Sequence, residues 1–168
     1  MEARQDDRRD ADWVQELLRN FQDKLTCGLY EAIYRLDERA LGSLMHAQAH
    51  TCAGAFLDLV DLPVPMTLDA FLDAIRTAGP SQIDITREGD VIHWRERHRG
   101  ECVCPFVKRG VTRLDAKLCI CGAHWVERLF AVVTGTAVRV ETVETAATGA
   151  EDCYFRIAVQ GPLTSTPP

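Results

Sequence analysis

The spacing of apolar residues changes once along the chain, and this change constrains the fold more than any other feature. Up to Pro80, apolar side chains recur every three or four residues, as they do on one face of an amphipathic helix. After Pro80 they alternate with polar side chains, which is the period of a strand. This order predicts an α+β domain whose N-terminal helices pack on one face of a small antiparallel sheet.

Three helices are expected before Pro80 and one after it. Gly28 offers a break between the first two, and Thr67 is a suitable N-cap for the third. Asp115 is the expected cap of the fourth helix, and Gly135 its expected end. Strands are expected on both sides of turns at Gly89 and Gly149. We therefore predict a single domain over residues 11–160, with a flexible N-terminus at 1–10 and a flexible tail at 161–168.

Composition narrows the possible partners. The 168 residues include 19 basic and 25 acidic side chains, and the resulting net charge of -6 is unlike that of a nucleic-acid-binding protein. No apolar run approaches the roughly 18 residues that span a bilayer, and no apolar leader follows Met1. We expect a cytoplasmic protein with no nucleic-acid or membrane partner. The odd number of cysteines, seven, favours thiols or metal ligands over disulfides.

Two C-x-C pairs form the most distinctive motif of the chain. Cys102 and Cys104 make one pair, and Cys119 and Cys121 make the other. Thiolates are preferred ligands of zinc, and in an extended backbone a C-x-C pair points both sulfurs to one side. If Cys119 and Cys121 already lie in a helix, their side chains face apart and only one can join the site. Cys153, on the last strand, is either a further ligand or a core residue.

The number of protein ligands decides what such a zinc ion would do. Four cysteines close a structural site, whereas three ligands and a water molecule give a Lewis acid that generates hydroxide near neutral pH. For catalysis we expect the metal ligand or nucleophile to come from the two C-x-C pairs, with Cys104 as the first candidate. His124 or His50 is the expected proton carrier, with His124 as the first candidate.

Three further histidines are candidates for substrate binding. His46 and His50 are four residues apart, so they share one face of the second helix. His93 and Trp94 point to opposite faces of a strand, so one of them is expected to line a space between helices and sheet. Without the glutamate of an H-E-x-x-H motif, His46 and His50 fit a ligand pocket better than a metal site.

The stretch from Cys102 to Ile157 resembles the C-terminal half of vinyl-4-reductase (V4R) type ligand-binding domains and of L-2-amino-thiazoline-4-carboxylic acid hydrolase-like proteins. Cys104-Pro105 and Leu118-Cys119 resemble two cysteine motifs of the hydrolase-like group, and the segment from Gly149 through Cys153 to Arg156 resembles its closing signature. The V4R resemblance implies a zinc held by cysteines and a glutamate. The matching positions are Cys119 and Cys153, with Glu141 or Glu144 nearby, while Thr145 stands where those sensors have a further cysteine.

Two functions follow. The first is a small metal-thiolate hydrolase that acts on a heterocyclic or sulfur-containing substrate, as the resemblance to amino-thiazoline-carboxylate hydrolases implies. The second is a non-catalytic V4R-type sensor or carrier of a small molecule, with a structural zinc. The chain has no ATPase motif or basic recognition helix on which a sensed signal would act, which favours the hydrolase. The long apolar helices leave room for a homodimer.

Overall fold

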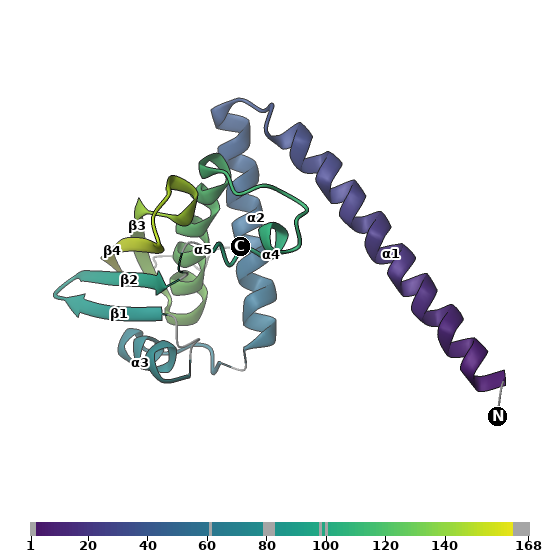
Figure 1. Cartoon of the computed structure of the whole chain (residues 1–168). Coiled ribbons are helices and arrows are strands. Elements are labelled where there is room, and N and C mark those ends of the chain that lie inside the picture. The colour runs from purple at the N-terminus through teal and green to yellow at the C-terminus, as the bar shows by residue number, and fades with distance from the viewer. Residues whose placement is uncertain (1–2, 61, 79–82, 98, 100, 163–168) are drawn as a thin grey trace.

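The computed structural model describes residues 3–60, 62–78, 83–97, 99 and 101–162. Figure 1 shows a sheet with helices against one face and a long N-terminal helix that leaves the body of the molecule. In chain order the elements are α1 (Ala3–Ile33), α2 (Glu38–Leu59), α3 (Leu68–Ala78), β1 (Ile83–Glu88), β2 (Val91–Arg97), α4 (Pro105–Lys108), α5 (Ala116–Thr134), β3 (Thr136–Glu144), a short 3-10 turn (Ala146–Thr148) and β4 (Asp152–Pro162).

The sheet is antiparallel throughout and has the strand order β1-β2-β4-β3. Alternation along β2 turns Ile92 and Trp94 to one face, where both are fully buried. In β4, Phe155 and Ile157 pair with these two positions and extend the same apolar face. The α+β class and the antiparallel sheet predicted from the sequence are therefore confirmed.

The helix that lies directly on this face is α5, from the second half of the chain. Its buried side chains Val126, Leu129 and Phe130 belong to the same core cluster as Trp94. Gly122 allows the close approach, because a Cβ atom at this position would lie only 3.1 Å from Cζ of Phe155. Helix α2 packs on α5 from the outside, so α5 separates it from the sheet (Figure 1).

Helix ends follow the predicted capping residues. The Asp115 carboxylate accepts a hydrogen bond from the backbone N–H of Lys117 at 2.9 Å, and Gly135 ends α5 with φ of 63°. At α3, the Thr67 hydroxyl accepts from the backbone N–H of Ala70 at 3.2 Å. Local sequence chemistry therefore sets these boundaries.

Helix α1 differs from the prediction at both ends. It runs through Gly28 without a break, since one glycine within a helix costs only about 1 kcal/mol. The break comes instead before Asp37, whose side chain accepts from the N–H of Ala40 at 2.8 Å and caps α2. The helix begins at Ala3, ahead of the domain start predicted at residue 11. At the other end, β4 reaches Pro162, and the rest of the predicted tail lies outside the described residues.

Among the described helices, none combines the length and the apolar character that crossing a lipid bilayer requires.

Candidate functional site

Three imidazole rings meet where α2 packs against α5. His46 and His50 stand one turn apart on α2, and their ring centroids are 4.2 Å apart. His124 of α5 approaches His46 with a centroid separation of 4.9 Å. The structure therefore brings together three residues predicted separately, two as substrate ligands and one as a proton carrier. We call this group, with Glu127 and Arg128 of α5, the histidine cluster.

Glu127 fixes one side of the histidine cluster. One of its carboxylate oxygens lies 3.0 Å from Nδ1 of His124, and the other accepts the backbone N–H of Val140 at 3.3 Å. Val140 is on β3, at the edge of the sheet. The carboxylate thus ties α5 to the edge strand and orients the imidazole, and each of its oxygens already has a partner.

Arg128 is near enough to His50 for its charge to act on that ring. Its Nη1 atom is buried and has no hydrogen-bond partner. Burial lowers the pKa of His50, and the charges of His46, Arg128 and His124 lower it further. Because its pKa is lowered, the His50 ring is mostly neutral at pH 7.

The C-x-C pairs lie in different kinds of structure. Cys102 and Cys104 are in the loop that leads to α4, where the backbone N–H of Cys104 lies 3.4 Å from Sγ of Cys102. Cys119 and Cys121 both belong to the start of α5, so their side chains leave the helix in different directions. Cys121 packs in a second apolar cluster that contains Tyr30, whereas Cys153 packs against the main core.

Burial keeps several of these thiols protonated. It raises the pKa of Cys119 to about 11 and that of Cys121 to about 12, and neighbouring cysteines add to both shifts. Burial also raises the pKa of Cys102 and Cys153. Thiols with such pKa values contain very little thiolate at neutral pH, and the thiolate is the form that attacks substrates.

The prediction of a metal-binding site is wrong for the described part of the chain. Within the described ranges, no group of three or more histidine, cysteine, aspartate or glutamate side chains is placed to hold a metal ion. The physical reason is the helical start of α5, which separates the second C-x-C pair, together with the core position of Cys153. Among the described residues, the predicted ligands do not form such a group, and the zinc cofactor itself stays a prediction. These predicted ligands are Cys102, Cys104, Cys119, Cys121 and Cys153.

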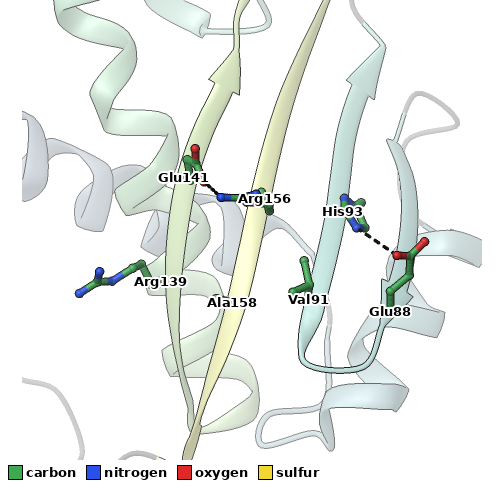
Figure 2. Close-up of a pocket in the computed structure, with 7 residues that line it drawn as sticks. All are labelled: Glu88, Val91, His93, Arg139, Glu141, Arg156 and Ala158. Atoms are coloured by element: carbon green, nitrogen blue, oxygen red, sulfur yellow. Dashed lines mark hydrogen bonds and ion pairs between the residues drawn. The ribbon is translucent and has the colours of Figure 1, made fainter.

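His93 lies far from the histidine cluster, on the outer face of the sheet. It lines a shallow hollow of about 480 Å³, and Figure 2 shows that the lining residues come from all four strands. Its Nδ1 is 2.6 Å from the hydroxyl of Tyr154, and its Nε2 is 3.9 Å from the carboxylate of Glu88. Trp94 points the other way into the core, so no substrate space opens beside it. The hollow is lined by Glu88, Val91, His93, Arg139, Glu141, Arg156 and Ala158.

Glu127 and Arg128 were not predicted from the sequence. They follow His124 by three and four residues, so the helical period alone places them on neighbouring positions of one face. The spacing could therefore have indicated that both residues lie near His124. The sequence could not indicate that Nη1 of Arg128 is buried without a hydrogen-bond partner, because this depends on tertiary packing.

Comparison with known proteins shows the fold but no family. No family model matches the chain, and no curated protein sequence matches it significantly. The resemblance to V4R domains and amino-thiazoline hydrolases thus receives no support from either search. Among solved structures, a trafficking protein particle complex subunit 3 from Naegleria fowleri, covalently bound to palmitic acid, is similar with a TM-score of 0.51 and 9% identity. The match covers 87% of this chain and 99% of that one.

Proposed function

We propose that this chain is a non-catalytic assembly subunit that pairs with a second copy of itself through α1. The observation that carries this proposal is the apolar face of α1, whose large side chains are exposed in the single chain. Seven large apolar side chains on this face are exposed, with Trp13 at 63% and Phe21, Leu25 and Leu29 each at 59%. The others are Val14, Leu17 and Leu18. A contiguous apolar patch of this kind marks an interaction surface.

The opposite face of α1 already holds the helix to the body of the protein. Arg109 donates to the carboxylate of Asp23 at 2.6 Å, and Gln48 donates to the Tyr30 hydroxyl at 3.0 Å. The Tyr30 ring also contacts Phe106, with centroids 5.6 Å apart. Because these contacts anchor one face, the apolar face of α1 is directed away from its own domain.

The outer face of α2 has the complementary shape. Apart from Leu44 it carries small uncharged residues, and an added Cβ atom at Gly54 would meet nothing within 4 Å. Large side chains on α1 can therefore fit against small ones on α2. The apolar face of α1 from Trp13 to Leu29 is about 24 Å long, and the small-residue face of α2 is about 22 Å long, at 1.5 Å per residue. The exposed residues of the α2 face are Ala40, Ser43, Leu44, Ala47, Thr51, Gly54 and Ala55.

One chain carries both complementary faces. A second copy of the chain therefore supplies a partner for each face, which is why we propose a homodimer. A two-fold axis that places α1 of one copy on α2 of the other repeats the same contact twice, which is the usual form of a homodimer. The solved structure of similar fold is a subunit of a trafficking particle complex, and an assembly role agrees with that kind of protein. The bound palmitic acid belongs to that protein alone.

The hydrolase predicted from the sequence has less support. Its proposed pair, Cys104 and His124, shares no hydrogen bond within the described residues, and His124 is held by Glu127 instead. Burial also keeps Cys119 and Cys121 protonated. The alternative of a sensor with an apolar pocket between sheet and helices requires space that Trp94, Phe130 and Phe155 fill.

Sedimentation equilibrium of the whole chain tests the proposal. At micromolar concentration we expect a mass about twice the 18.8 kDa of one chain. Dilution to nanomolar concentration should reveal the monomer. A mass of one chain at every concentration would show that α1 does not bind a second copy.

A further inference from the structure

We infer that the hollow on the outer face of the sheet binds a small zwitterion. Such a molecule carries an ammonium group at one end, a carboxylate at the other and a short apolar chain between them. The hollow opens to solvent on the face of the sheet that α5 leaves uncovered (Figure 1). This inference is independent of the proposed dimer, because α1 and α2 contribute no residue to the hollow.

The floor of the hollow is a row of residues that crosses all four strands. Glu88 of β1 pairs with Val91 of β2, and Val91 pairs in turn with Ala158 of β4. Ala158 also pairs with Arg139 of β3. Residues paired in this way stand side by side on one face of a sheet. Because Val91 and Ala158 are short, the centre of the row is low, and the space above it, about 480 Å³, suits a small molecule.

The row has opposite charges at its two ends. Glu88 stands on the edge strand β1, where its side chain is 80% exposed, and Arg139 stands exposed on the other edge strand, β3. Neighbouring strands are about 4.8 Å apart, so the α-carbons of these two residues are separated by about 14 Å. The row therefore presents a negative group, an apolar centre and a positive group in that order, which is complementary to an extended zwitterion.

Two other groups in the hollow already have partners within the chain. Arg156 donates a hydrogen bond to the carboxylate of Glu141. Nδ1 of His93 is hydrogen-bonded to the hydroxyl of Tyr154 at 2.6 Å. These contacts hold the wall beside the row in place, and they leave the charges at the ends of the row as the available binding groups.

The two end charges lack such partners. The carboxylate of Glu88 lies 3.9 Å from Nε2 of His93, which is too long for a hydrogen bond. Arg139 forms no hydrogen bond or ion pair with any other described residue. Its side chain extends past the edge of β3 in Figure 2, so its guanidinium is accessible to a carboxylate from solution.

The sum of these charges decides the class of ligand. Glu88 and Arg139 together contribute no net charge, so the row favours neither anions nor cations as such. A ligand with one charge engages one end only and is repelled by the other. A zwitterion engages both ends, and its apolar chain covers Val91 and Ala158.

NMR titration of the full-length chain tests the assignment, with 6-aminohexanoic acid as the zwitterion. Hexanoate and hexylamine carry one charge each, and glycine carries both charges close together. We expect 6-aminohexanoic acid to shift the amide signals of Val91 and Ala158 and to bind about fivefold more tightly than each of the other three at equal ionic strength. Equal or tighter binding of hexanoate or hexylamine, or no shift at these amides, would overturn the inference.

Charge reversal at the ends of the row locates the site. Glu88→Lys and Arg139→Glu should each weaken binding of 6-aminohexanoic acid about fivefold. The double variant should bind about as tightly as the original chain, because the zwitterion can then lie in the opposite direction. Two variants that each simply damaged the fold would not restore binding when combined. If a reversal disturbs folding, Glu88→Gln and Arg139→Gln replace it, with a loss in the same direction.

The matched control is Asp84→Lys. Asp84 is exposed on the same face of β1 as Glu88, but it lies four residues away and does not line the hollow. Its reversal should leave the affinity for 6-aminohexanoic acid unchanged. An equal loss in Asp84→Lys and Glu88→Lys, or a double variant that stays as weak as the single ones, contradicts the assigned site.

Discussion

Phe21→Glu is expected to convert the dimer to a monomer. The change places two carboxylates per dimer, one from each copy, inside an apolar contact, and burying an unpaired charge costs several kcal/mol. We expect the dissociation constant to rise at least 100-fold, which corresponds to about 2.7 kcal/mol. Because Phe21 is 59% exposed within one chain, the stability of the monomer should change by less than about 0.5 kcal/mol. Sedimentation velocity measures the first effect, and urea unfolding the second.

The matched control for Phe21→Glu is Arg19→Glu. Arg19 is exposed on the same helix, and two residues of separation place it about 160° away around the helix axis. It should therefore leave the dimer intact. If both variants dissociate, a general charge effect explains the loss, and if neither does, the apolar face of α1 is not the interface.

Gly54→Arg is expected to abolish the dimer from the other side of the contact. Gly54 is exposed on α2, and no atom lies within 4 Å of the Cβ position, so one chain accommodates the longer side chain. Replacing glycine within a helix should even stabilise the monomer, by about 0.5–1 kcal/mol. In the proposed dimer, the arginine occupies the space that α1 of the partner needs. We expect a dissociation constant at least 100-fold higher together with an unchanged or higher thermal midpoint.

Gly42→Arg is the control on the same helix. A Cβ atom at Gly42 also meets nothing within 4 Å, but Gly42 lies on a different side of α2 from the small-residue face. The control should remain dimeric. A dimeric Gly54→Arg variant beside a monomeric Phe21→Glu variant would mean that α1 packs on another surface of the second copy.

Sequence reasoning succeeded where the structure depends on local chemistry. Asp115, Gly135 and Thr67 act as the predicted helix boundaries, and the alternation in β2 places Trp94 in the core. These features need only the neighbouring residues along the chain, which the sequence displays directly. The helical period also predicted that His46 and His50 share one face of a helix. It did not predict that His46 approaches His124.

The errors come from features that tertiary structure decides. The C-x-C pair of Cys119 and Cys121 indicates a chelate only in an extended backbone, and α5 begins before it. Gly28 looks like a helix end, yet α1 continues past it to Ile33, and Tyr30 beyond the glycine is anchored to Gln48 of α2. Nη1 of Arg128 is buried without a hydrogen-bond partner, which depends on tertiary packing and is not visible in residue spacing.

Photo-crosslinking from position 21 tests the central claim most directly. The photoreactive residue benzoylphenylalanine replaces Phe21, and equal amounts of ¹⁴N- and ¹⁵N-labelled chains are mixed before irradiation. We expect mixed-isotope crosslinks to the tryptic peptide 40–76, which contains most of α2. Crosslinks confined to a single chain, or to α1 of the second copy, would contradict the reciprocal packing of α1 on α2.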